Sequence, residues 1–302
     1  MKIVVITGPT ATGKSNLSIK LTDIFPFEIV NFDSMQVYKY FDIGTAKPPK
    51  NILEKYPHHL LSYVHPLDFS YSGARFVEDA DKKIKEIYEK GKIPLFVGGT
   101  GLYMKLLLFG IFDKEEKGEN FREILKKQLE DYGSDYIFTK LKVIDFKAYK
   151  KINRNDLYRT IRALDYFYKT GELISEKRLK HNFSQKRYKY LKIGIKFERE
   201  ELYKRINNRV DRMISDGLIE ETENLIKMGF SNSRPMQGIG YREIKDYLSG
   251  KIKKKEAIEE IKKNTRKYAK RQITWFKKEN DINWISSFDE AKDLINKFLE
   301  KE

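Results

Sequence analysis

The chain has 302 residues, no cysteine and a formal net charge of +16, and 34% of its residues are charged. This composition excludes disulfides, thiolate nucleophiles and cysteine-ligated zinc, while the length allows two domains. The basic excess favours a polyanionic partner such as nucleic acid, although a lysine-rich proteome, as in some thermophiles, would give a similar excess.

The chain begins with an apolar, β-branched run, residues 2–7, which predicts a buried strand, and residues 16–25 predict a helix. The glycines between them let backbone N–H groups turn toward an anion, Lys14 adds a point charge, and the Ser15 hydroxyl can bind Mg²⁺. Strand, loop and helix in this order predict a P-loop for a di- or triphosphate rather than a glycine-rich turn with an incidental lysine. The motif G-x-x-x-x-G-K-[ST] comprises Gly8, Pro9, Thr10, Ala11, Thr12, Gly13, Lys14 and Ser15.

A second apolar run, residues 27–33, predicts a short strand that ends on Asp33. Ligands of parallel α/β proteins bind at the carboxyl ends of strands, so Asp33 would lie beside the P-loop if the first two strands are neighbours. An aspartate at this junction is also a common N-cap, here for a helix that starts at Ser34. Both roles can hold together.

A third buried-type strand, residues 93–97, is followed by Gly98-Gly99-Thr100. A Walker-B strand would end in an acidic residue that holds Mg²⁺, so this ending weakens an interpretation as an ordinary ATPase. The glycines indicate close approach of the backbone to a ligand, with the Thr100 hydroxyl presented there. A tight turn whose glycines only supply positive φ is the alternative.

The composition shifts after this region. Residues 113–185 are rich in Lys, Glu, Asp and Tyr, contain no buried strand pattern, and predict helices that include 155–169. We interpret them as a helical insertion between two parts of a core, residues 1–112 and 186–302. Arg159 and Arg162 in the insertion are three residues apart and share a helix face.

The last third of the chain predicts a strand at 191–197 and a helix at 199–216. Arg205 and Arg209 are four residues apart on that helix, a spacing that suits a diphosphate, although surface pairing with Glu201 and Asp211 is equally compatible. Residues 236–243 predict a loop with glycine hinges, and residues 253–278 predict a long basic amphipathic helix.

Together these motifs resemble one family, the tRNA dimethylallyltransferases, also called tRNA isopentenyltransferases. The resemblance implies an α/β fold: a P-loop core of nucleotide-kinase type, with a parallel sheet flanked by helices, and an inserted, mainly helical domain that grips the anticodon stem-loop. Leu61-Ser62 departs from the family, which has an acidic residue after His-His-Leu-Ile. The matching segments follow the family's order: 8–15, 33–38, 42–48, 57–60, 97–103, 202–221, 236–243 and 265–276.

The resemblance implies transfer of a dimethylallyl group from dimethylallyl diphosphate to the exocyclic amine of the adenosine 3′ of the anticodon in tRNA, with release of diphosphate. It makes Asp33 the general base and lets Thr100 orient the amine or the bridging oxygen. The P-loop residues and Arg209 would bind the diphosphate, with Mg²⁺ at Ser15. The implied tRNA contacts are Asp33, Ser34, Met35, Gln36, Thr45, Lys47, Thr100, Arg159, Arg162, Gly240, Tyr241 and Arg242.

Two other classes of protein remain open from the sequence. A nucleoside or small-molecule kinase would use the same loop for ATP and would need a lid with transition-state arginines. An RNA-binding ATPase or P-loop switch would need a hydrolytic carboxylate and a water-positioning residue. We expect no membrane partner, because Lys105 interrupts the apolar run of residues 102–112 and leaves no stretch that could span a bilayer. We also expect the protein to be cytoplasmic and a monomer.

Overall fold

The protein is described from a computed structural model, which covers residues 1–111 and 121–300. It divides into two compact units: Met1–Leu108 with Arg187–Glu302, and Phe109–Lys186. The first predicted boundary, between residues 112 and 113, lies outside the described residues. The second predicted boundary follows residue 185, and the second unit ends one residue later, at Lys186.

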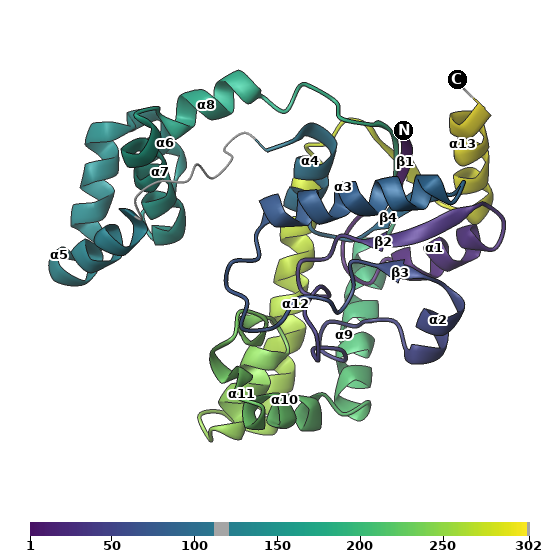
Figure 1. Cartoon of the computed structure of the whole chain (residues 1–302). Helices are drawn as coiled ribbons and strands as arrows, with labels where there is room; N and C mark the ends of the chain where they lie inside the picture. The colour runs from purple at the N-terminus through teal and green to yellow at the C-terminus, as the bar shows by residue number, and fades with distance from the viewer. Residues whose placement is uncertain (112–120, 301–302) are drawn as a thin grey trace. The chain divides into compact units, whose positions relative to one another are not determined.

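A parallel sheet forms the centre of the first unit (Figure 1). Six strands pair in the order β3-β2-β4-β1-β5-β6. Most are buried on both faces, which explains their continuous apolar sequences. The predicted parallel α/β core is confirmed, whereas β6 has too short and mixed a sequence to be predicted. The strands are β1 (Lys2–Thr7), β2 (Phe27–Asn31), β3 (His58–His59), β4 (Ile93–Val97), β5 (Lys189–Ile195) and β6 (Ile282–Ile285).

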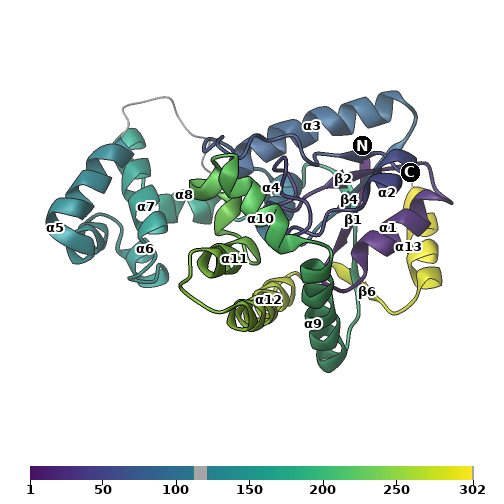
Figure 2. The ribbon, with the colours of Figure 1, turned by 90° about the horizontal axis from the view of Figure 1, so that it is seen from below.

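Helices cover both faces of the sheet (Figure 2). On one face, α1 (Lys14–Thr22) and α13 (Phe288–Glu300) bury apolar side chains against the strands. On the other face, α3 (Gly73–Glu89) lies beside α4 (Gly101–Phe109), and the rings of Phe76 and Tyr103 stack with centroids 4.3 Å apart. The short helix α2 (Lys50–Lys55) precedes β3.

A group of helices from the last third of the chain borders the carboxyl ends of the strands. These are α9 (Arg199–Ser215), α10 (Leu218–Lys227), α11 (Tyr241–Leu248) and α12 (Lys254–Phe276), with short 3₁₀ turns η1 (Phe230–Asn232) and η2 (Pro235–Gln237).

Residues 236–243, predicted as a loop, include the connection 238–240 with both glycines, together with the end of η2 and the start of α11. The Glu243 carboxylate accepts a hydrogen bond from Gly240 N at 2.8 Å, so a glutamate at the third helical position caps α11. Backbone φ at Gly240 is 101°, a conformation that favours glycine at this helix start.

The elements of the second unit, in the part that the structure describes, are all α-helices. They are α5 (Phe121–Ile144), interrupted at Gly133, then α6 (Phe146–Lys151), α7 (Leu157–Thr170) and α8 (Ile174–His181). Its core gathers buried side chains from α5, α6 and α7, including Leu125, Leu141, Ala148 and Leu164. Within the described ranges of the whole chain, no helix combines the length and apolarity needed to cross a membrane.

Candidate active site

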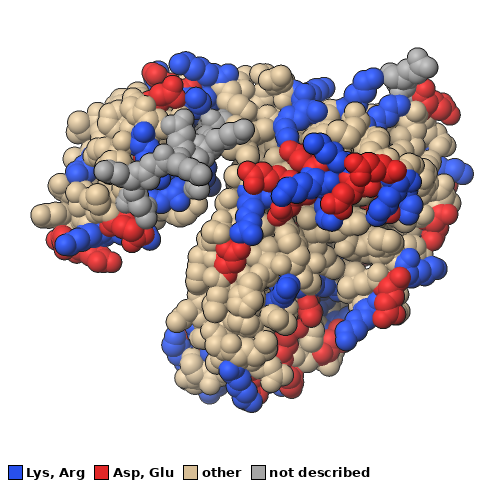
Figure 3. Space-filling model, in the orientation of Figure 1, with Lys and Arg blue, Asp and Glu red and all other residues tan. Residues whose placement is uncertain are grey.

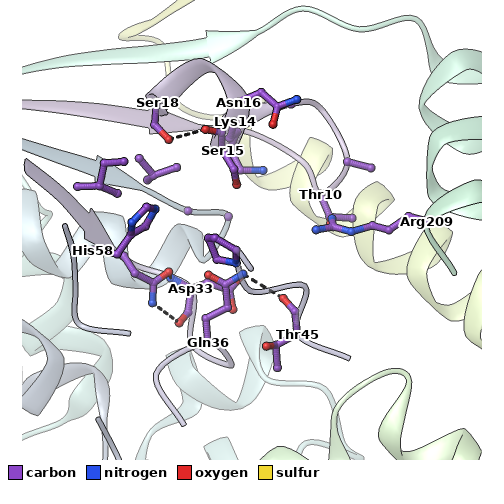
Figure 4. A pocket seen from close by; sticks show the side chains of 18 of the residues that line it. Thr10, Lys14, Ser15, Asn16, Ser18, Asp33, Gln36, Thr45, His58 and Arg209 are labelled. Carbon is purple, nitrogen blue, oxygen red and sulfur yellow. Dashed lines mark hydrogen bonds between the residues drawn. The ribbon is translucent and has the colours of Figure 1, made fainter. Parts of the chain in front are cut away.

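A cavity of about 350 Å³ lies at the carboxyl ends of β1, β2 and β4 (Figure 4). The P-loop, the segment after β2 and the turn after β4 line it, together with side chains of α9 and α12. Segments far apart in the sequence therefore meet at the edge of the sheet where parallel α/β proteins bind ligands. The predicted residues that line it are Thr10, Ala11, Gly13, Lys14, Ser15, Asp33, Gln36, Thr45 and Arg209.

The P-loop owes its shape to its glycines. Gly8 and Gly13 have φ of 134° and 93°, in the region that side chains with a Cβ rarely adopt. The buried Thr12 hydroxyl donates a hydrogen bond to Pro9 O at 3.0 Å and so closes the loop on itself. Because α1 begins at Lys14, the unsatisfied N–H groups of its first turn lie at the loop. This arrangement suits an anion.

Lys14 and Arg209 bring two partly buried cations to the cavity. Lys14 Nζ donates hydrogen bonds to Gly8 O at 3.0 Å and Pro9 O at 2.6 Å, while Arg209 donates to Thr10 Oγ1 at 2.9 Å. Burial and, to a smaller extent, the charge of Arg209 lower the pKa of Lys14 to about 7, while Asp33 opposes the decrease. Burial also lowers the pKa of Arg209. A bound anion would relieve both effects.

Arg205, whose spacing from Arg209 was predicted to suit a diphosphate, is more exposed than Arg209. Arg205 also lines the cavity, but its side chain is 52% exposed and pairs with Glu201 at 2.9 Å. The surface pairing left open by the sequence therefore describes Arg205, whereas Arg209 lies inside the site.

Asp33 lines the cavity although its strand, β2, is not next to β1. β4 lies between β1 and β2, so the first two strands are not neighbours and the condition set for placing Asp33 beside the P-loop is not met. Asp33 nevertheless lines the same cavity as Lys14. Its carboxylate accepts a hydrogen bond from Met35 N at 2.9 Å and caps a turn, residues 34–37, rather than a helix.

The glycines after β4 serve close packing. A Cβ on Gly98 would lie 2.8 Å from atoms of Phe32, and one on Gly99 would lie 2.4 Å from Gln272 Nε2. Neither glycine has a positive φ, so the tight-turn alternative is wrong. Because these two glycines have no side chains, the segment after β2 and the helix α12 can pack closely against this turn.

Thr100 connects this turn to the segment that follows Asp33. Its Oγ1 accepts a hydrogen bond from Ser34 N at 3.0 Å and donates one to Ser34 Oγ at 3.3 Å. Thr100 does not line the cavity, whereas the backbone of Gly98 and Gly99 does.

Three residues expected to contact tRNA are buried instead. The Lys47 side chain is 3% exposed and donates hydrogen bonds to Tyr38 O and the Asp42 carboxylate, and Gly240 is also buried. Tyr241 is 1% exposed; its hydroxyl accepts from Gly44 N at 3.0 Å and donates to Glu221 at 2.5 Å. The Lys47 and Tyr241 side chains support the loop of residues 42–47 and offer almost no surface to RNA, which argues against the predicted contacts.

The other expected RNA contacts are spread over the chain. Gln36 holds the same loop through hydrogen bonds from Nε2 to Thr45 O and Ala46 O. Arg242 is partly exposed and pairs with Glu243 at 2.7 Å. Arg159 and Arg162 lie on α7 in the second unit, where the Arg159 side chain is 70% exposed and pairs with Asp156 at 3.2 Å.

Two polar residues that organise the cavity were not predicted from the sequence. Gln272 is 6% exposed on α12 and contacts both the P-loop and the turn after β4. Asn31 ends β2, accepts a hydrogen bond from Asp33 N at 3.0 Å and donates one to Leu60 O at 3.0 Å. Each is a polar residue within an apolar pattern, and that was the available signal.

The chain matches known proteins over nearly its whole length. The family models described as IPP transferase and Isopentenyl transferase match residues 36–279 and 1–62. A tRNA dimethylallyltransferase from Thermoanaerobacter sp. (strain X514) is 45% identical over 99% of this chain and 98% of that protein. One from Carboxydothermus hydrogenoformans is 46% identical, over 99% and 96% of the two chains.

Solved structures agree with these matches. A tRNA delta(2)-isopentenylpyrophosphate transferase from Staphylococcus epidermidis is similar with a TM-score of 0.71 and 38% identity, over 100% of this chain and 99% of that one. A eukaryotic dimethylallyltransferase described as acting on tRNA gives a TM-score of 0.80 and 32% identity, over 94% of this chain and 73% of that one. The chain therefore belongs to the IPP transferase family, the tRNA dimethylallyltransferases.

Proposed function

We propose that this protein transfers a dimethylallyl group from dimethylallyl diphosphate to the exocyclic amine of the adenosine 3′ of the anticodon in tRNA. The bond between the allylic carbon and the diphosphate oxygen breaks, and the electron pair leaves with the diphosphate. A bond forms between that carbon and the adenosine nitrogen, which then loses a proton. The observation that carries the proposal is that Lys14, Arg209 and Asp33 line one cavity.

The two cations support the role of diphosphate as leaving group. Negative charge develops on the diphosphate as the carbon–oxygen bond breaks, and fixed cations at that point stabilise it. Lys14 has a pKa of about 7 and is poised to become fully charged beside an anion. Thr12, Gly13 and Ser15 complete the loop around the same group.

Asp33 supports the acceptor half of the reaction. Figure 4 shows Asp33 across the cavity from Lys14 and Ser15, so a donor held by the loop would present its carbon toward the carboxylate side. The amine becomes acidic as its new bond forms, and Asp33 can receive that proton. Thr100 holds the segment after Asp33 through Ser34.

A divalent cation, which we propose is Mg²⁺, fits the residues present. Among residues 1–111 and 121–300, no group of three or more His, Cys, Asp or Glu side chains could hold a metal. Mg²⁺ binds through few protein ligands together with substrate phosphates and water. The exposed Ser15 in the cavity is suited to this arrangement. When bound, Mg²⁺ would add positive charge for the leaving diphosphate.

We propose the tRNA anticodon stem-loop as partner of a cytoplasmic monomer. The net charge of +16 would neutralise phosphates along the stem. The target adenosine must leave its stack to reach the cavity, which costs least in a single-stranded loop. We assign the grip on the stem to the helical insertion, residues 113–185, with Arg159 and Arg162, and the reaction to the core.

The test compares two donors. Purified protein with Mg²⁺ and an unmodified anticodon stem-loop is incubated with dimethylallyl diphosphate or with ATP. Mass spectrometry should show one five-carbon unit added to the RNA from the allyl donor, with no RNA phosphorylation and no ADP from ATP. Phosphate transfer from ATP, without mass gain from the allyl donor on any of several adenosine-bearing stem-loops, would establish the kinase instead.

A further inference from the structure

Gln272 joins two parts of the active site that lie far apart in the sequence. Its Oε1 accepts a hydrogen bond from Thr10 N in the P-loop at 2.9 Å, and its Nε2 donates one to Gly99 O in the turn after β4 at 2.9 Å. The side chain projects from α12 and is 6% exposed; its bond to Gly99 is buried and its bond to Thr10 is partly buried.

The backbone of the turn is shaped to receive α12. A Cβ on Gly99 would lie 2.4 Å from Gln272 Nε2, and a Cβ on Gly101 would lie 2.2 Å from Trp275 Nε1. Thr100 lies between these two glycines and binds Ser34, next to Asp33. The helix therefore packs directly on the backbone that carries Thr100.

Thr10 is held from two helices at once. Gln272 on α12 takes its backbone N–H, and Arg209 on α9 donates to its hydroxyl. The Thr10 N–H therefore attaches the P-loop to α12. Gln272 also binds the turn after β4, which lies beside the P-loop because β1 and β4 are paired.

The polar character of Gln272 calls for an explanation beyond packing. The buried residues near it on α12 are apolar, Ala269 and Phe276, and a side chain of similar size such as methionine would fill the space. A buried amide is tolerated only when its hydrogen bonds are made, and then it fixes one geometry. What its amide fixes is the separation between the diphosphate loop and the turn.

We propose that Gln272 is a positioning residue that sets the distance between the donor-binding P-loop and the Thr100 turn on the acceptor side. This inference rests on the proposed function. Transfer requires the allylic carbon and the adenosine nitrogen to meet in a narrow range of distance and angle, and a displacement of about 1 Å can cost roughly 10²-fold in rate. Gln272 would therefore act on turnover more than on the affinity for either substrate.

The first test replaces Gln272 by methionine, which retains volume and removes both hydrogen bonds. We expect kcat for allyl transfer to fall about 10- to 100-fold, while KM for each substrate changes less than about threefold. Binding of inorganic pyrophosphate, measured by calorimetry, counts correctly folded sites and should keep its stoichiometry. An unchanged kcat, or a decrease that matches the loss of pyrophosphate sites, would reduce Gln272 to a structural residue.

The second test displaces the same amide from the other side. In Gly99→Ala the added methyl group would push Gln272 Nε2 away from Gly99 O, so this variant should lose kcat as Gln272→Met does. The double variant should lose little more than the more affected single variant, because both variants break the bond between Gln272 and Gly99. Independent, multiplicative losses would overturn the proposal.

Two controls separate the possible failures. Thr274→Ala changes an exposed residue of the same helix and should leave kcat unchanged. If the wild-type protein transfers no allyl group, the proposed function fails and this inference with it. If the wild type transfers the group and Gln272→Met equals it, the positioning role alone fails.

Discussion

The cavity and the second unit, Phe109–Lys186, use positive charge in different ways. In the cavity, Lys14 and Arg209 are partly buried and are held by hydrogen bonds to the P-loop. On α7 of the second unit, the Arg159 side chain is 70% exposed and pairs with Asp156 on its own helix. Charges withdrawn from water bind an anion strongly at a fixed place, whereas exposed charges attract it weakly and depend on salt.

The two groups of cations therefore suit different ligands. The buried cations suit one small ligand in one geometry, as a leaving group requires. Exposed arginines suit an extended polyanion, whose phosphates each contribute a small, screened term. Variants in the cavity should therefore change turnover and donor binding, and variants in the second unit should change RNA affinity.

The largest effect should come from Asp33→Asn, which keeps the shape of the side chain and removes its basicity. We expect turnover to fall roughly 10²–10⁴-fold, the range for a positioned general base. RNA affinity should stay within a few-fold, because the fold and the basic surface remain. The measurement is single-turnover kinetics beside RNA titration, with the exposed Asp216→Asn as control. Near-normal turnover would remove Asp33 from the mechanism.

The pH dependence of donor binding should show the next largest effect. The pKa of Lys14 is lowered to about 7, and a bound diphosphate raises it by favouring the charged form. Binding then takes up a proton above pH 7, so donor affinity should fall as pH rises, approaching about tenfold per pH unit. Lys14→Arg, which stays charged, should bind with little pH dependence. Equal slopes for both proteins would contradict the shifted lysine.

The arginine pair on α7 should have a moderate effect. Replacing Arg159 and Arg162 by alanine should weaken RNA binding and lower the slope of log K against log salt by up to about 2, since fewer counterions are released. Pyrophosphate affinity should not change. Lys82→Ala/Lys85→Ala removes the same charge from the exposed face of α3 and serves as control. If both double variants have the same slope, net charge rather than the α7 pair governs RNA binding.

Tyr241→Phe should have the smallest effect, and it tests the corrected role of Tyr241. Loss of the hydroxyl removes its bonds with Gly44 N and Glu221, so the free energy of unfolding should fall by about 1–3 kcal/mol. The salt dependence of RNA binding should be unchanged because the side chain is buried. A reduced salt slope with unchanged stability would restore the predicted RNA contact.

The local features of the site could be predicted from the sequence because their signals are local. The P-loop motif lies between a strand and a helix, and the structure has β1 and α1 at those places. Asp33 followed an apolar run and does follow β2. The glycines after β4 indicated close approach of the backbone to a ligand, and the structure shows that they admit the side chains of Phe32 and Gln272.

The remaining features depend on tertiary contacts that no local pattern contains. The order of the strands places β4 between β1 and β2, so the route by which Asp33 reaches the cavity depends on topology. Lys47 and Tyr241 have an apolar body and a polar tip, and such side chains are compatible with both surface and core. Gln272 contacts Thr10 across 262 positions of sequence, and only the fold brings them together.

The fate of the bridging oxygen shows whether the cavity releases an intact diphosphate by cleavage on the carbon side. Dimethylallyl diphosphate carrying ¹⁸O at that position is reacted with an anticodon stem-loop, and the products are analysed by mass spectrometry. We expect the released diphosphate to retain the label and the modified RNA to carry none. Labelled dimethylallyl alcohol, with the label absent from the phosphate product, would show phosphorus–oxygen cleavage and rule out allyl transfer with diphosphate as leaving group.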